Sequence, residues 1–138
     1  MLDSFYNPIF YLLKLNGELF KSLGPPSFPE EHYEREEAVL VWDKVVENAI
    51  VPNNRKICKI INKFCHFVDS EDLLENYFDF VKHAESYEVF RKDPNQLHTK
   101  FKYPNNFIDI IVSGRARVIN KLINIEKDVG KFISERNY

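Results

Sequence analysis

The chain has 138 residues, a formal net charge of −2 and a hydrophobic content of 44%. This length suits one domain with a single buried core and excludes two domains of ordinary size. The nearly balanced charge provides no general attraction to nucleic acid or to an anionic membrane. Only four residues are glycine, and polar/apolar alternation is almost absent, so the composition predicts an all-α protein.

The first helix is expected to begin at Asn7, acting as the N-cap before Pro8, and to end at Gly24 in the left-handed conformation. Residues 1–23 then form an amphipathic helix, whose apolar side predicts packing on the rest of the chain. Its aromatic residues leave a second interpretation open, in which residues 5–23 attach to a membrane surface. The apolar run is too short to cross a bilayer.

Residues 24–29 are rich in proline and predict a stiff linker, followed by the bundle core of residues 30–138. Pro29 is expected to open the second helix. An apolar stripe runs from there through Trp42 and continues beyond Pro52. Because the two parts of the stripe need only a modest bend to face one neighbour, we expect one proline-kinked helix rather than two separate helices.

A third helix is expected to begin at Asp69-Ser70, which offers a capping side chain, and to run to about Arg91, before Asp93-Pro94 stops it. Its apolar residues predict one buried face. The residues expected on that face are Leu74, Tyr77, Phe78, Val81 and Ala84.

The fourth helix is expected to run from Pro104 to about Arg136. Its stripe alternates steps of three and four, the heptad pattern of packed helices. Arg115 interrupts the stripe, so it is expected either to find a carboxylate, for which Asp43 or Glu47 could serve, or to reach the surface at the end of the bundle. We therefore predict an all-α, four-helix, up-and-down-like bundle with a proline-kinked second helix and a long C-terminal helix. The stripe consists of Ile108, Ile111, Arg115, Val118, Leu122, Ile125, Val129 and Phe132.

Cys58 and Cys65 are seven residues apart in the expected second helix, about 10 Å along its axis and too far for a disulfide. Together with the lack of a signal-peptide pattern, this favours a reducing compartment. His66, Asp79 and His83 could join the two thiols in a metal site. Zinc ligands, however, come in close pairs, and this spacing predicts buried thiols, no metal site and no cofactor.

Arg91 and His98 are separated by six residues. This spacing resembles the motif of the HEPN ribonucleases, small all-helical domains. The resemblance implies phosphodiester cleavage, in which His98 would serve as acid or base. In this chain Lys92 follows the arginine where that family favours a polar residue, and Asp93-Pro94 interrupts the helix. The alternative is a solvated loop histidine.

Basic residues recur along the second and fourth expected helices and could form a phosphate-binding face. Acidic residues are slightly more numerous in the whole chain, with 21 against 19 basic ones, so solvated helix faces explain the basic residues as well. Nucleic-acid binding is kept as an alternative and is not expected. The basic residues are Arg55, Lys56, Lys59, Lys63, Arg115, Arg117 and Lys121.

The spacing of several polar residues around the expected kink resembles a set of uncharacterised bacterial helical proteins, over roughly residues 24–126. The resemblance implies the helical fold and a bacterial origin, and it brings no established activity. Related chains often carry a membrane segment before the linker, where this chain has an amphipathic helix. The residues that carry it are Trp42-x-x-Val45-x-x-Asn48-x-x-x-Pro52-x-Asn54-Arg55, the preceding Gly24-Pro25-Pro26 and the later His83-x-x-x-Tyr87.

Six of these residues are binding candidates. If the second and third helices are antiparallel neighbours, the histidine and tyrosine lie near the tryptophan, either as a polar network that fixes the kink or as a small recognition pocket for a peptide or ligand. The candidates are Trp42, Asn48, Asn54, Arg55, His83 and Tyr87.

The sequence favours a non-enzymatic interaction module that binds a protein partner or associates with itself. Its expected location is the cytoplasm, with peripheral attachment to the inner face of the membrane through residues 5–23 as an alternative. The competing hypotheses are a HEPN-like ribonuclease that uses Arg91 and His98, and a helical protein that binds nucleic acid.

Overall fold

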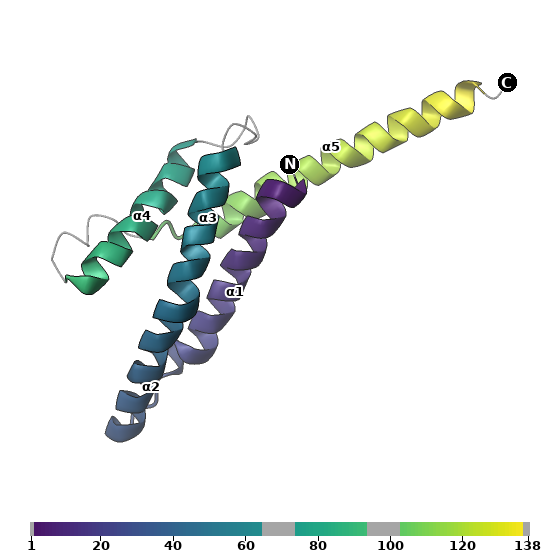
Figure 1. Cartoon of the computed structure of the whole chain (residues 1–138). Helices are drawn as coiled ribbons and strands as arrows, with labels where there is room; N and C mark the ends of the chain where they lie inside the picture. Colours follow the sequence, from purple (N-terminus) through teal and green to yellow (C-terminus); the bar gives the residue numbers. More distant parts are fainter. Residues whose placement is uncertain (1, 65–73, 94–102, 137–138) are drawn as a thin grey trace.

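The computed structural model describes residues 2–64, 74–93 and 103–136, and this part of the chain contains helices and turns but no strand. Counted as continuous rods, its helices number four (Figure 1). The all-α prediction is confirmed. The elements are η1 (Leu2–Tyr6), α1 (Asn7–Leu23), η2 (Pro25–Ser27), α2 (His32–Val45), η3 (Val46–Ile50), α3 (Val51–Phe64), α4 (Leu74–Lys92) and α5 (Phe107–Arg136).

Two prolines lie inside continuous helices, and a π-helical turn precedes each of them. Pro8 follows η1, and Pro52 follows η3. A proline lacks the backbone donor of an α-helix, and its ring crowds the carbonyl four residues earlier. The wider π-helical turn accommodates this defect, so that α2, η3 and α3 form one uninterrupted rod (Figure 1). The prediction of one helix through Pro52 is confirmed.

Asn7 does not cap the first helix, because the helix continues upstream through η1 and Tyr6 is already helical. The Asn7 amide instead donates a hydrogen bond to Asp3 Oδ1 at 3.2 Å. Its Oδ1 accepts a hydrogen bond from Arg115 Nε of α5 at 2.6 Å. The predicted N-cap is therefore wrong, since this side chain links α1 to α5.

Gly24 follows α1 in an extended conformation, with φ −85° and ψ −173°, so the predicted left-handed stop is also wrong. Its N–H donates to the Phe20 carbonyl at 2.8 Å. A Cβ atom on residue 24 would lie 2.4 Å from the same carbonyl oxygen. Glycine is needed here because the chain passes close to the helix end. It is not needed for a left-handed backbone conformation.

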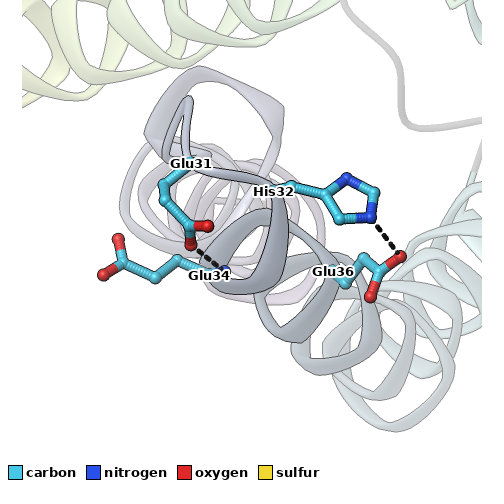
Figure 2. A network of polar contacts seen from close by, with 4 residues as sticks. All are labelled: Glu31, His32, Glu34 and Glu36. Carbon is cyan, nitrogen blue, oxygen red and sulfur yellow. Dashed lines mark hydrogen bonds and ion pairs between the residues drawn. The ribbon is translucent and has the colours of Figure 1, made fainter.

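The second rod begins at His32 rather than at Pro29, because Glu31 is the N-cap. The Glu31 carboxylate accepts a hydrogen bond from the Glu34 N–H at 2.9 Å, as Figure 2 shows. One turn along, His32 Nε2 lies 3.0 Å from the Glu36 carboxylate (Figure 2). Both contacts are local and exposed. The acidic start of α2 is therefore a solvated, self-capped helix end.

α4 ends at Lys92, close to the predicted position, whereas its predicted start at Asp69-Ser70 lies outside the described residues. Its buried face contains Tyr77, Phe80 and Ala84. Of the residues expected there, Leu74 and Phe78 are exposed. Phe80, which was not among the residues expected on this face, takes the central position because it lies one turn from both Tyr77 and Ala84.

The core is aromatic, and it forms where η1, α4 and α5 meet. The Tyr77 ring lies 5.7 Å from the Phe5 ring and 5.6 Å from the Phe107 ring. Phe80 packs against Phe107 with a centroid distance of 4.6 Å. Offset and edge-on arrangements of this kind add to the free energy gained from burial. Five side chains at this junction are fully buried, namely Phe5, Tyr6, Tyr77, Phe80 and Phe107.

α1 packs on the rest of the chain through Ile9, Leu12 and Leu13, which are buried in the same core. Of the two interpretations of residues 5–23, packing is the arrangement in the structure. No helix among the described residues combines the length and apolar character needed to cross a membrane.

α5 divides into two parts, and its second part extends away from the other helices (Figure 1). Phe107, Ile111 and Val118 are buried in the core. Every residue from 120 to 133, which we call the α5 tail, is exposed. The prediction that the whole stripe packs within the bundle is therefore wrong for its second half. We call the remainder of the packed helices, with the first part of α5, the body.

Candidate functional site

Three asparagines form a hydrogen-bonded cluster between α1 and α3. Asn53 Nδ2 donates to Asn16 Oδ1 at 2.9 Å, and Asn16 Nδ2 donates to Asn54 Oδ1 at 3.1 Å. Asn53 and Asn54 are 7% and 8% exposed, so these amides have lost most of their water. Buried amides that satisfy each other fix the register of two helices. The Asn54 candidate therefore holds α1 against α3.

A pocket of about 250 Å³ opens beside this cluster, between α3 and α4. Across it the Arg55 guanidinium of α3 makes an ion pair with the Glu88 carboxylate of α4. Lys59 and Glu85 add one charge of each sign, so the formal charges of the lining cancel. The lining residues are Asn54, Arg55, Cys58, Lys59, Asn62, Ala84, Glu85 and Glu88.

Cys58 is the thiol of this pocket and is 9% exposed. Burial raises its pKa from 9.0 to about 11, and the negative charges of Glu85 and Glu88 add to that rise. A thiol with so high a pKa is protonated at neutral pH and is a poor nucleophile and a poor metal ligand. Among the described residues no group of three or more His, Cys, Asp or Glu side chains could hold a metal ion.

Two features of this pocket oppose catalysis or anion binding. Arg55 and Glu88 neutralise each other, and the Cys58 thiol keeps its proton. The geometry suits an ion-paired groove between packed helices better than a ligand site, because a ligand pocket needs convergent polar groups that remain available.

Trp42 and Asn48 lie elsewhere on the second rod. The Trp42 ring packs edge-on against Phe20 of α1 with a centroid distance of 5.9 Å. The Asn48 amide donates to the Lys44 carbonyl of its own helix at 2.8 Å. Trp42 thus joins α2 to the end of α1, and Asn48 is exposed on the other side of η3 from the buried Val46.

His83 and Tyr87 form an aromatic pair one turn apart on α4, with a centroid distance of 6.0 Å. Tyr103, which precedes α5, packs edge-on against His83 at 5.1 Å. Neither ring lines the pocket that contains Asn54 and Arg55. The six candidates therefore lie in four different surroundings: Asn54 and Arg55 at the pocket, Trp42 against Phe20, Asn48 on the exposed side of η3, and His83 beside Tyr87.

Arg91 lies at the end of α4, and its guanidinium donates to the Asp43 carbonyl of α2 at 2.8 Å. This contact ties α4 to the second rod. His98 and the candidate metal ligands Cys65 and His66 lie outside the described residues, so the spacing of Arg91 and His98 is not tested by the structure.

Arg115 makes different contacts from those expected. Its guanidinium donates to Asn7 Oδ1 at 2.6 Å and lies 5.5 Å from the centre of the Phe10 ring. The predicted partners Asp43 and Glu47 were wrong, because α5 packs on η1 and α1 rather than on α2. A neutral amide and an aromatic face suit a half-buried guanidinium at the edge of the core.

The α5 tail was not predicted from the sequence as a functional site. Its large apolar residues are 43% to 58% exposed, and four of them continue the stripe that is buried in the body. The helix lengths indicated that part of α5 would extend beyond α4, because α5 has 30 residues and α4 only 19. The exposed residues are Leu122, Ile123, Ile125, Val129, Phe132 and Ile133. We call Leu122, Ile125, Val129 and Phe132 the tail stripe.

Acidic side chains border the tail stripe at its middle. Helical periodicity places Glu126 on one side of Ile125 and Val129, and Asp128 on the other side. Lys127 lies on the opposite face of the helix. Lys121 borders the stripe one turn before its middle, so the border changes from basic to acidic along the tail.

Comparisons of this chain with protein-family models, with curated proteins and with solved structures gave no match. The resemblance to uncharacterised bacterial helical proteins therefore stays a prediction. The function is inferred from the geometry of this chain alone.

Proposed function

We propose that this chain is a non-enzymatic helical interaction module, and that its docking surface is the tail stripe of α5. The observation that carries the proposal is the exposure of four large apolar side chains on one face of a projecting helix. Contiguous exposed apolar surface with a polar border is characteristic of protein interaction sites.

The physical chemistry of isolated helices supports this function. Residues 120–133 are exposed throughout, and an isolated helix of about 14 residues is only marginally stable in water. Gly130 lies in the tail and destabilises its helix by about 1 kcal/mol relative to alanine. A partner that covers the stripe would supply the contacts that the body supplies to Phe107 and Ile111.

The alternatives receive less support. A nuclease needs Arg91 available to a phosphodiester, and its guanidinium donates to the Asp43 carbonyl. A nucleic-acid surface along α3 would use Arg55, which is paired with Glu88. Attachment to a membrane through residues 5–23 would have to expose Ile9 and Leu13, which are buried in the core.

The test is affinity capture of the tagged full chain from its native cells, in extracts treated with RNase. The variant Ile125→Glu/Phe132→Glu places two charges on the tail stripe. A matched control, Lys127→Glu, changes the charge on the opposite face. We expect wild type and control to recover the same stoichiometric protein, and the double variant to lose it.

Recovery that is unchanged in Ile125→Glu/Phe132→Glu would show that the tail stripe is not the docking surface. Recovery that disappears with RNase in all three proteins would instead support nucleic-acid binding. Circular dichroism of the purified variants checks that the body is still folded, and exposed positions are expected to tolerate these changes.

A further inference from the structure

The second rod, which consists of α2, η3 and α3, carries opposite charges at its two ends. Residues 30–37, at its start, contain five glutamates and one arginine, a formal net charge of −4 with the histidine neutral. Residues 55–63 contain three lysines, one arginine and no acidic residue, a formal net charge of +4. We call these two segments the acidic end and the basic end. A rod with charges separated in this way attracts a partner that has the reverse order.

At the acidic end, part of the charge is used locally. Glu31 caps α2, and the Glu36 carboxylate lies beside His32, as Figure 2 shows. Glu30 and Glu37 are exposed, and neither makes an ion pair within the described part of the chain. These two carboxylates are therefore available to another molecule.

At the basic end, the Arg55 guanidinium is already paired with Glu88 of α4. Lys56 and Lys63 are exposed, and no ion pair involves either of them among the residues that the structure describes. Lys63 Nζ lies 5.2 Å from the centre of the Phe64 ring, a contact that does not neutralise its charge. Two ammonium groups are therefore available at this end.

The available charges of both ends lie on one side of the rod. α1 packs against the rod at Trp42 in α2 and at the asparagine pair 53–54 in α3. Helical periodicity places Glu37 about 140° around the axis from Trp42. In the same rotational sense, Lys56 and Lys63 lie about 110° and 130° from the midpoint of the asparagine pair. Relative to α1, the carboxylate and the two ammonium groups thus share a face.

We propose that this face binds the same face of a second copy of the chain, with the two rods antiparallel. The antiparallel direction brings each acidic end to the basic end of the other copy. The register that places Glu37 opposite Lys56 also places Glu30 opposite Lys63, because both steps along the rod are seven residues. The contact is two-fold symmetric, so each of these ion pairs forms twice.

Apolar residues lie at the centre of this register. Val41, which is 47% exposed, is placed opposite the half-buried Pro52, and Leu40, which is 63% exposed, borders the same contact. Covering these side chains adds the burial of apolar surface to the charge pairing. The rod runs from His32 to Phe64 and is roughly 50 Å long, which is long enough for an interface of about 1,000 Å² or more.

Other occupants of this face satisfy only part of its charge. A second copy in the parallel direction places like charges against each other at both ends, which opposes association. A nucleic acid could contact the basic end, but the acidic end of the same face would repel its phosphates and would keep its own carboxylates unpaired. An antiparallel second copy pairs both ends at once. This surface is separate from the tail stripe, so the inference goes beyond the proposed function.

The test measures the oligomeric state of the purified full chain by sedimentation equilibrium. Wild type is expected to form a dimer at about 0.05 M salt. Its dissociation constant should rise at least about tenfold at about 0.5 M salt, because exposed charge pairs are screened. A dimer held mainly by apolar contacts would not weaken with salt, and that result would overturn the inference.

Two reciprocal variants test the pairing directly. Glu30→Lys/Glu37→Lys places two lysines in every pair, and Lys56→Glu/Lys63→Glu places two glutamates in every pair. Each variant alone should have a dissociation constant at least about tenfold above that of wild type. An equimolar mixture of the two should form a heterodimer, because every pair then joins a lysine to a glutamate. Circular dichroism checks that each variant is folded, as expected for exposed positions.

The control Lys127→Glu/Lys131→Glu changes the same number of charges on the α5 tail and should leave the dimer unchanged. A wild type that stays monomeric at low salt, or a mixture of the rod variants that stays monomeric, would overturn the inference. So would a dimer that is lost in Ile125→Glu and retained in both rod variants, or a monomer that binds RNA through Lys56 and Lys63. The proposed function fails separately, when capture of the partner is unchanged in Ile125→Glu/Phe132→Glu.

Discussion

The two parts of α5 carry one apolar stripe in opposite surroundings. Ile111 and Val118 of the stripe are buried in the body, whereas Ile125 and Phe132 of the tail are more than half exposed. The amino-acid types and their spacing are similar in both parts. Helical periodicity thus identifies the face that forms contacts, but not whether those contacts lie in the same chain. The buried contacts of the body stabilise the fold, and we propose recognition only for the tail.

Replacing the same residue type in each part gives the largest expected contrast. Ile111→Ala removes fully buried methyl groups and should lower the free energy of unfolding by about 2–5 kcal/mol. Ile125→Ala should change it by no more than about 0.5 kcal/mol. Urea unfolding followed by circular dichroism measures both. Similar losses in the two variants would mean that the tail folds as part of the core.

Thiol reactivity distinguishes the same two environments. Cys58 has a pKa of about 11 against an ordinary value of 9.0, so its thiolate fraction at pH 8 is about 100-fold lower than that of a free cysteine. A cysteine introduced by Lys127→Cys in the tail should therefore react with iodoacetamide at least about 100-fold faster. Peptide mass spectrometry resolves the two sites. Equal rates would contradict the burial of Cys58.

Because the pKa of Cys58 is raised, the free energy of unfolding of the body should depend on pH in the alkaline range. Between pH 9 and about 11 the unfolded thiol loses its proton while the folded thiol retains it. The unfolded state then binds fewer protons, so the free energy of unfolding falls as pH rises through this window. The fall should be smaller in Cys58→Ala, measured by urea unfolding at each pH. An identical slope in the two proteins would remove Cys58 as its cause.

The asparagine cluster predicts a smaller contrast. Asn53→Ala leaves the half-buried Asn16 Oδ1 without its donor and removes a buried amide, and it should lower the free energy of unfolding by about 1–3 kcal/mol. Asn124→Ala, the matched change in the exposed tail, should have almost no effect. Thermal and urea unfolding of both variants test this. A neutral Asn53→Ala would show that water replaces the lost donor.

Much of the fold follows from local sequence patterns. The helices, the end of α4 and the passage of the second rod through Pro52 were predictable, because apolar periodicity and proline chemistry act within a few residues. The capping errors at Asn7 and Gly24 have a different cause. Asn7 forms a hydrogen bond with Arg115 of a distant helix, and Gly24 lies close to the Phe20 carbonyl. Both contacts depend on the path of the chain outside the first helix.

The candidate sites were less predictable, because they depend on contacts between distant segments. The spacing of Asn54 and Arg55 indicated polar residues near the kink, but their partners Asn16 and Glu88 lie on other helices. The tail stripe was identified by its spacing and assigned to the wrong environment. The charged residues at its border, Lys121, Glu126 and Asp128, were present in the sequence, but only the structure shows that the stripe beside them is exposed.

Two glycines in open helical positions give the smallest and most direct comparison. A Cβ atom on Gly17 in α1 or Gly130 in the tail would have no atom within 4 Å, so alanine fits at both. Gly17→Ala should raise the free energy of unfolding by about 0.4–1 kcal/mol, because the unfolded chain loses freedom. Gly130→Ala should leave the global value unchanged and slow amide hydrogen exchange in the tail by up to about fivefold. Exchange slowed across the body by Gly130→Ala would mean that body and tail unfold together, and the division between a stable body and a separately unfolding tail would fail.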